Sequence, residues 1–245
     1  MASDTEQMVD NEVQGYHTIV TNRSIFDGEH TPQNISSYGF LLGIVFGAGF
    51  TASIYIKSPQ LCLYMAFLAL FHYLEYTLTA IYNSHTLSLD SYLLNHSTEY
   101  ILANVIVLLE YLIELYFFGD FKKFGFLNIL GIVFILSGQL ARTLAMYTAK
   151  HNFTHQVASF KEKEHVLVTD GIYRLMRHPS YFGFYWWALG TQFLLLNPIG
   201  IIGFAIALQY FFSKRIAYEE FTLQRFFGDE YTQYTKKTRT LIPFI

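Results

Sequence analysis

The chain has 245 residues, of which 52% are hydrophobic and only 14% charged. A soluble domain normally carries about 25% charged residues, so this composition indicates a polytopic membrane protein. The net charge of −3 argues against nucleic acid as a partner. A single cysteine, Cys62, excludes an intrachain disulfide and a cysteine-based metal site.

The first 38 residues are polar and acidic and contain no apolar core. They therefore do not resemble a cleavable signal peptide, whose central region is apolar. We expect residues 1–38 to form a flexible cytosolic tail.

Six apolar segments follow, and a helix needs about 20 mostly apolar residues to cross a bilayer. They predict an all-α, polytopic integral membrane protein with about six transmembrane helices. The segments are 39–56, 60–82, 101–118, 125–148, 180–196 and 199–213. Asn197-Pro198 separates the last two, and a proline suits the first turn of a new helix. The sequence thus predicts a C-terminal helical hairpin, whose second helix continues past Phe212 into the cytosol.

Lys and Arg residues set the expected orientation, because they favour the cytosolic side of a membrane. They gather in the 149–179 loop and after the hairpin, at Lys150, Lys161, Lys163, Arg174, Arg177, Lys214, Arg215, Arg225, Lys236, Lys237 and Arg239. Both regions and the N-terminus are therefore expected in the cytosol. Lys122 and Lys123 then lie on the opposite side, against the rule. We divide the chain into a four-helix transmembrane region, 39–148, and a catalytic region, 149–245.

Several ionisable residues lie inside the predicted spans, where they are costly and often functional. They are His72, Glu75, Glu110, Glu114 and Arg142. A structural network, in which Arg142 neutralises a glutamate and holds helices together, explains Glu110 and Glu114 as well as a functional role does. Hydrogen bonds between helices are the favoured interpretation for His72 and Glu75.

The 149–179 loop contains four histidines, which raises the question of a metal site. They are His151, His155, His165 and His178. His151 and His155 are four residues apart, but the intervening Asn-Phe-Thr favours a turn over a helix. No carboxylate stands at ligand spacing, so we predict that the protein binds no metal here.

Two polar clusters flank the predicted hairpin. Arg177 to Tyr181 reads Arg-His-Pro-Ser-Tyr and precedes its first helix, and free N–H groups at a helix start favour an anion. Arg215 and Glu219 lie four residues apart where the second helix leaves the membrane. A plain interfacial anchor and an exposed i,i+4 pair are the simpler interpretations. Our hypothesis is that the two clusters close on each other and form the active site.

Separated blocks of the sequence support this hypothesis. They read FHYLEYTLTAIYN, ARTLAMYTAKHNFTHQV, HVLVTDGIYRLMRHPSY, RHPSYFGFYWWALGTQFLLLNP, FFSKRIAYEE and FFGDEYTQYTKKT. Together they resemble the isoprenylcysteine carboxyl methyltransferase family over about residues 39–245, with the length of its shorter fungal members. The family uses S-adenosylmethionine to methylate the C-terminal carboxylate of a prenylated cysteine. The resemblance implies a multi-pass protein of the endoplasmic reticulum membrane with a cofactor pocket facing the cytosol.

The resemblance also implies partners and site residues. The substrates would be prenylated CaaX proteins, such as small GTPases or lipidated peptide pheromones, and the surroundings membrane lipid. Arg215 and Glu219 would be the catalytic pair, with Arg215 facing the substrate carboxylate. The cofactor would contact His165, Val166, Leu167, Val168, Tyr173, His178, Pro179, Ser180, Tyr181 and Glu219. Lys150 departs from the family, which usually has a glycine there, so the turn before Asn152 stays open.

The chemistry agrees with these assignments. A C-terminal carboxylate has a reference pKa of about 3.5, so it is already ionised and needs no strong general base to attack a sulfonium methyl. It needs a cation to orient it, which Arg215 can supply, and Glu219 can hold the ammonium group of the cofactor. The prenyl chain is apolar and is expected to arrive laterally from the bilayer.

Three other functions are compatible with parts of the sequence. An NADPH-dependent membrane reductase of the sterol-reductase type has a similar Arg-His and Tyr pattern but would need positive charge for a 2′-phosphate. A phospholipid methyltransferase uses the same cofactor, but its amine nucleophile gives an arginine no purpose. A transporter or receptor would also use the buried Glu110, Glu114 and Arg142.

Overall fold

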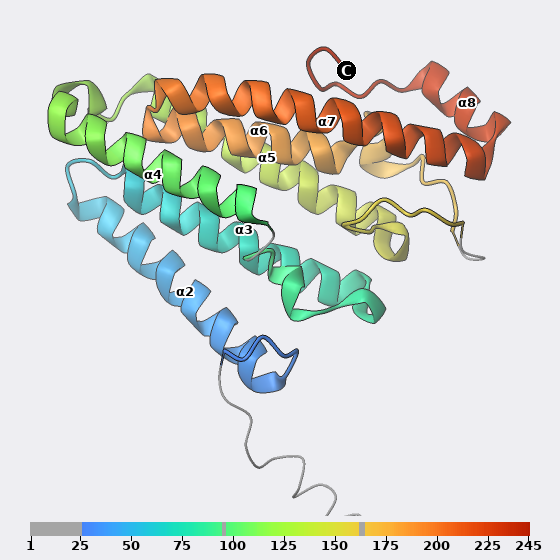
Figure 1. The fold of residues 1–245 in the computed structure, drawn as a ribbon, viewed down its shortest axis with the longest axis horizontal. Coiled ribbons are helices and arrows are strands. Elements are labelled where there is room, and N and C mark those ends of the chain that lie inside the picture. Colours follow the sequence, from blue (N-terminus) through green and yellow to red (C-terminus); the bar gives the residue numbers. More distant parts are fainter. Residues whose placement is uncertain (1–25, 95–96, 162–164) are drawn as a thin grey trace, which may run out of the picture.

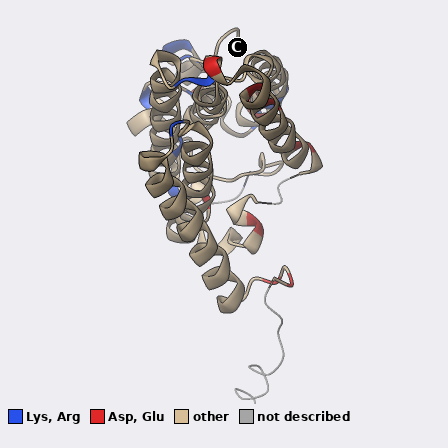
Figure 2. Cartoon of the chain, turned by 90° about the vertical axis from the view of Figure 1, so that its left-hand side faces the viewer, with Lys and Arg blue, Asp and Glu red and all other residues tan. Residues whose placement is uncertain are grey.

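The structure is a computed structural model that describes residues 26–94, 97–161 and 165–245. Over these ranges the regular structure is helical, apart from one isolated β-bridge between Met176 and Arg239. Most of the helical surface carries no charged residue (Figure 2). Residues 1–25 of the expected tail lie outside the described residues.

Six long helices form the body of the protein (Figure 1). They are α2 (Pro32–Tyr55), α3 (Gln60–Tyr82), α4 (Thr98–Phe118), α5 (Phe126–Ala149), α6 (Pro179–Leu195) and α7 (Pro198–Phe227), and the shorter α8 (Asp229–Lys237) follows. Single 3-10 turns are η1 (Ser84–Thr86), η2 (Leu89–Tyr92), η3 (Gly119–Lys122), η4 (Lys150–Asn152) and η5 (Gly171–Arg174). The predicted all-α membrane fold is thus confirmed.

Five of the described helices are long and apolar enough to cross a membrane, namely α2, α3, α4, α5 and α7. Helix α6 has 17 residues, which reach roughly 26 Å at 1.5 Å per residue. The sixth span therefore stays a prediction. The division of the chain at residues 148 and 149 also stays a prediction, although α5 and α6, from its two sides, make the most extensive helix contact.

The first helix begins at Pro32, seven residues before the predicted position. Thr31 caps it, since its hydroxyl accepts a hydrogen bond from the Asn34 amide at 3.3 Å. The Asn34 side chain is buried and donates to Asp27 Oδ1 at 2.6 Å and to the Glu29 carbonyl at 2.7 Å. The helix thus starts within the predicted tail, because hydropathy detects apolar surface and not the polar cap that starts a helix. The boundary of the membrane region at residue 38 stays a prediction.

Helices α6 and α7 form the predicted C-terminal hairpin, and α7 continues past Phe212 to Phe227. Leu196 ends α6 in the left-handed conformation, with φ 55°, and Pro198 stands in the first turn of α7. Lys122 fixes this reversal: its buried ammonium donates to the carbonyls of Leu195 and Leu196, both at 2.9 Å. A cation at a helix C-terminus is favourable, which explains a lysine on the side where the orientation rule disfavours one.

The partly buried glutamates at this end also have structural partners. Glu110 accepts hydrogen bonds from the amides of Ile199, at 2.8 Å, and Gly200, at 2.9 Å, and so caps α7. Glu114 pairs with Lys122 at 2.5 Å. Both glutamates therefore have partners of the kind that the structural interpretation expects, but Arg142 is not one of them. His72 makes the expected hydrogen bonds between segments, to the Tyr92 carbonyl at 2.8 Å and the Tyr100 hydroxyl at 3.0 Å.

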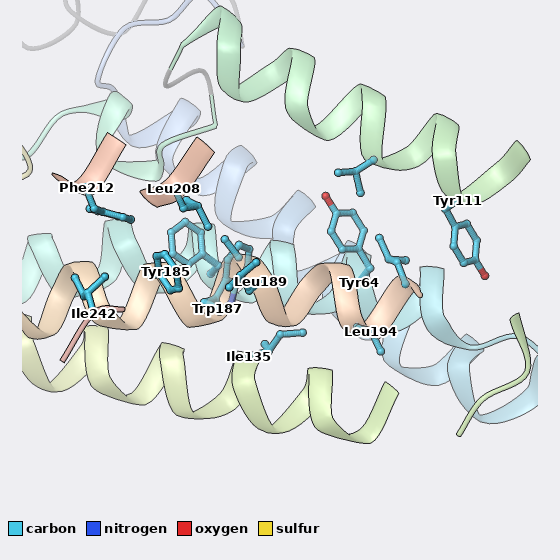
Figure 3. Packing of buried hydrophobic residues seen from close by; sticks show 14 of the residues in the cluster. Tyr64, Tyr111, Ile135, Tyr185, Trp187, Leu189, Leu194, Leu208, Phe212 and Ile242 are labelled. Atoms are coloured by element: carbon cyan, nitrogen blue, oxygen red, sulfur yellow. The ribbon is translucent and has the colours of Figure 1, made fainter. Parts of the chain in front are cut away.

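Helices α5 and α6 touch through their backbones at two pairs of glycines. A Cβ atom on Gly183 would lie 2.5 Å from the Gly138 carbonyl oxygen and 2.7 Å from the Arg142 amide nitrogen. A Cβ atom on Gly190 would lie 2.8 Å from the Gly131 oxygen. Small residues allow such close approach in membrane proteins, where packing replaces the hydrophobic effect between helices. Around this contact lies the main apolar cluster, in which Ile135 of α5 points toward α6 (Figure 3).

We expect Gly183→Ala to lower the free energy of unfolding by about 1–3 kcal/mol, because the new methyl group would overlap the backbone of α5. Gly203→Ala in α7 is the control, since nothing lies within 4 Å of the added methyl group. It should leave stability unchanged or raise it by up to about 1 kcal/mol. Reversible unfolding of both variants in mixed micelles measures the difference, and equal stability would contradict the backbone contact.

Candidate active site

A cavity that is partly open to the surroundings lies where α5 ends and α6 begins. Its walls come from the start of α6, the second half of α7, and the segment that joins α5 to α6. All the site residues expected from the sequence line it: His165, Val166, Leu167, Val168, Tyr173, His178, Pro179, Ser180, Tyr181, Arg215 and Glu219. The two clusters that flank the hairpin therefore close on each other, as hypothesised.

Tyr181 joins the two halves of the cavity. Its hydroxyl donates to Glu219 Oε2 and accepts a hydrogen bond from Arg215 Nε at 2.9 Å. The Arg215 guanidinium also lies over the Tyr181 ring, 5.4 Å from its centroid. In the described structure Arg215 and Glu219 form no ion pair with each other, so the exposed i,i+4 pair is ruled out. The sequence pattern paired these two residues but gave no sign of the tyrosine between them.

Glu220 is a residue that the sequence reasoning missed. Its Oε1 accepts from Arg177 Nε at 2.8 Å and lies 3.1 Å from His178 Nε2. The Arg177 guanidinium also donates to the Thr238 carbonyl. Arg177 therefore fastens the start of α6 to α7 and the C-terminal segment. The doublet Glu219-Glu220 on a helix was the available signal, since adjacent residues on a helix point in different directions.

The remaining wall comes from extended segments and a 3-10 turn. The Val166 amide donates to Asn152 Oδ1 at 3.0 Å, which fastens the 165–168 segment to the end of α5. The Tyr173 carbonyl accepts from the Tyr234 hydroxyl of α8 at 2.6 Å. Burial, with the nearby Glu219 carboxylate, raises the pKa of Tyr173, so its hydroxyl stays protonated and available as a donor at neutral pH.

The start of α6 adds an electropositive feature to the cavity. Pro179 occupies its first turn, and no side chain caps the helix. The first amide groups of a helix have no partner within it, so this end favours an anionic group. Glu219, part-buried on the α7 side, offers the opposite charge. The cavity thus presents separate places for an anion and a cation, together with aromatic faces.

His155 lines the cavity but belongs to no metal cluster. Its Nε2 donates to Glu75 Oε2 at 2.9 Å, and Glu75 is itself paired with Arg142. No group of three or more His, Cys, Asp or Glu residues in the described ranges is arranged to hold a metal ion. His151 is exposed and does not line the cavity.

Comparison with known proteins shows which family this sequence resembles. The model of the isoprenylcysteine carboxyl methyltransferase (ICMT) family matches residues 130–225. The chain is 45% identical over 206 residues to a protein-S-isoprenylcysteine O-methyltransferase from Xenopus laevis, covering 83% of this chain and 71% of that one. Identity to the Saccharomyces cerevisiae protein of the same name is 42% over 217 residues, covering 86% and 91% of the two chains.

A solved structure agrees with the sequence comparison. It is the eukaryotic intramembrane Ras methyltransferase ICMT, which matches with a TM-score of 0.81 and 39% identity, over 84% of this chain and 74% of that one. The chain belongs to the isoprenylcysteine carboxyl methyltransferase family. The part matched by the family model contains the α5–α6 contact, the 165–168 segment and the α7 residues of the cavity up to Leu223, but not Phe226 and Phe227.

A strained turn lies beside the cavity. Lys150, the position at which the sequence departs from the family resemblance, adopts φ 50° and ψ −124°. Gly228, after α7, adopts nearly the same conformation, with φ 54° and ψ −122°. Side chains with a Cβ disfavour this region, so the turn keeps a backbone shape that suits glycine and the lysine bears the strain.

Lys150→Gly should therefore raise the free energy of unfolding by about 1 kcal/mol, because it relieves the strain without changing the turn. Lys123→Gly is the matched control, since Lys123 has an ordinary φ of −67° and should gain nothing from the change. Thermal unfolding of both variants in detergent gives the comparison. A loss of stability in Lys150→Gly would mean that lysine contacts outweigh the strain.

Proposed function

We propose that the protein transfers a methyl group from S-adenosylmethionine to the C-terminal carboxylate of a prenylated cysteine and forms a methyl ester. The observation that carries this proposal is the placement of Arg215 and Glu219 in one cavity, separated by the Tyr181 hydroxyl. The named activity of the relatives supports it. The family relationship does not favour a sterol-type reductase or a phospholipid methyltransferase.

The residues of the cavity fit S-adenosylmethionine. Its cationic amino group suits Glu219, and its carboxylate suits the uncapped start of α6 near His178 and Ser180. The segment 165–168 and Tyr173 would hold the remaining part. When bound, the cofactor supplies an electrophilic methyl group on a positively charged sulfur.

The opposite wall of the cavity fits the prenylated cysteine. Arg215 can orient the substrate carboxylate with its planar guanidinium, whose donors match the geometry of a carboxylate. Because that carboxylate is already ionised at neutral pH, the protein needs to hold it in line and needs no strong base. The apolar wall suits the prenyl chain and consists of Phe71, Leu93, Tyr100, Phe184, Phe211 and Phe212.

We further propose that the substrates are prenylated CaaX proteins, such as small GTPases or lipidated peptide pheromones. The protein is a multi-pass membrane protein, and we place it in the endoplasmic reticulum with the cavity facing the cytosol. The positive residues around the cavity support this orientation. At the opposite end, Lys122 donates to a carbonyl at the end of α6 and pairs with Glu114. Exposed Lys123 pairs with Asp120 at 3.0 Å, so neither lysine is an unpaired positive charge that opposes this orientation.

The purified protein should transfer a labelled methyl group to N-acetyl-farnesylcysteine and not to its methyl ester. Arg215→Lys should reduce single-turnover methyl transfer strongly and leave affinity for S-adenosylhomocysteine nearly unchanged, because lysine loses the planar two-pronged grip on a carboxylate. Glu219→Gln should instead weaken S-adenosylhomocysteine binding about tenfold to a hundredfold, the value of a charge-assisted hydrogen bond.

The same assay gives the outcomes that count against the proposal. Absence of methyl transfer by the folded wild-type protein would remove the proposed function. Near-normal activity in both variants, or exchanged effects of the two changes, would remove the assigned roles while leaving the reaction in place.

The orientation makes a separate prediction. With Cys62 replaced by serine, single cysteines at the exposed positions 160 and 236 should react with an impermeant reagent in sealed microsomes. A cysteine at exposed position 123, beyond the opposite end of α4, should react only after the membrane is opened. Protection at 160 or 236 in sealed vesicles would reverse the proposed orientation.

A further inference from the structure

A buried ion pair lies beside the cavity. Glu75 of α3 is fully buried, and both its oxygens contact Arg142 of α5: Nε lies 2.5 Å from Oε1 and Nη2 lies 2.8 Å from Oε2. A buried pair is costly to remove from water, and swapping it for apolar residues is often neutral or stabilising. Helix packing alone therefore does not explain why this pair is here.

The pair contacts the cavity at two points. Glu75 Oε2 accepts a second hydrogen bond from His155 Nε2 at 2.9 Å, which fixes the segment that follows α5. Arg142 Nη1 donates to Ser180 Oγ at 2.8 Å, in the first turn of α6. Both His155 and Ser180 line the cavity. One buried carboxylate thus holds the two segments that meet there.

His155 passes this constraint to Arg215. The His155 main-chain carbonyl accepts a hydrogen bond from Arg215 Nη2, and the Tyr181 hydroxyl accepts one from Arg215 Nε. Nη1 has no hydrogen-bond partner in the part of the chain that the structure describes. Two fixed contacts along one edge of a rigid, planar group set its orientation and leave the Nη1 donors for a ligand.

We propose that Glu75 and His155 are positioning residues that orient Arg215 toward the substrate carboxylate. The inference rests on the proposed function, which assigns Arg215 to that carboxylate. Without the Glu75 contact, the His155 carbonyl belongs to a surface segment and has no reason to stay beside the guanidinium. Small displacements of a group that orients a reactant cause large losses of rate. The benefit of a fixed His155 carbonyl can therefore offset the cost of burying the Glu75 carboxylate.

A purely structural role for the pair predicts a different result. It would weaken all ligands together, through the fraction of folded protein. Positioning of Arg215 affects only ligands that carry a carboxylate. The affinity ratio between farnesylcysteine acid and its methyl ester therefore separates the two roles, and it can be measured without cofactor or turnover.

The test measures this ratio in wild type and in variants of His155. Wild type should prefer the acid about tenfold to a hundredfold, and His155→Ala should reduce the preference about threefold to tenfold with unchanged affinity for the ester. His155→Gln keeps an N–H donor for Glu75 and should restore most of the preference. His151→Ala, in the same segment but outside the cavity, should behave as wild type.

A double-mutant cycle with Arg215→Lys completes the test. Because His155 acts through Arg215, adding His155→Ala to Arg215→Lys should reduce the preference no further. Independent, multiplying effects of the two changes, or an unchanged preference in His155→Ala, would overturn the positioning role. An unchanged preference in Arg215→Lys alone would instead overturn the assignment of Arg215 in the proposed function.

Glu75→Gln is the direct variant, with Glu110→Gln as its matched control at the other end of the bundle. Both remove one hydrogen-bonded negative charge, fully buried at Glu75 and partly buried at Glu110, but Glu110 caps α7 and does not line the cavity. Only Glu75→Gln should reduce the preference for the acid. An equal reduction in both folded variants would show that buried charge in general, and not this contact, sets the preference. If Glu75→Gln does not fold, the His155 variants decide the matter.

Discussion

The backbone contact between α5 and α6 is the constraint on which the cavity depends. Where Gly183 meets Gly138, the two helices are so close that a single added methyl group would strike the Arg142 amide. Arg142 therefore leaves α5 next to the first turn of α6 and reaches both Ser180 and Glu75. A wider separation, with larger side chains at the contact, would move the guanidinium away from Ser180. The packing of two apolar helices thus determines where a polar site can form.

Charges inside the bundle are paired at both of its ends, but the pairs stabilise different parts of the structure. Lys122, Glu110 and Glu114 are used by the ends of α6 and α7, and they fix the reversal between those helices. At the cavity end, Glu75 and Arg142 are equally well paired. Their contacts, however, lead outward to His155 and Ser180 in the cavity wall. The contacts at the far end therefore hold the reversal between α6 and α7. In our proposal, the contacts at the cavity end orient Arg215.

The sequence predicted the helices and the hairpin better than it predicted the contacts between side chains. Apolar length located the long helices and Pro198 located the hairpin, because these signals are local. The start of α2 was missed, because a polar cap such as Thr31 with Asn34 leaves no mark on hydropathy. The residues that the family motifs named all line one cavity. These motifs could not show that Arg177 pairs with Glu220, or that Arg142 pairs with Glu75. Partners separated by tens of residues depend on helix rotation and register, which periodicity does not specify.

The Tyr181 hydroxyl solves a problem that the spacing of Arg215 and Glu219 creates. Opposite charges four residues apart on a helix can meet, and a guanidinium paired with its own carboxylate would have little left for either ligand. A hydroxyl can donate one hydrogen bond while accepting another, so it can stand between the two charges and satisfy each on one side only. Tyr181 does so with Glu219 as acceptor and Arg215 as donor. A phenylalanine there would supply the ring but let the charges collapse onto each other. The tyrosine thus keeps Arg215 and Glu219 apart on adjacent turns of one helix. Under the proposed function, this leaves Arg215 for the anionic acceptor and Glu219 for the cationic donor.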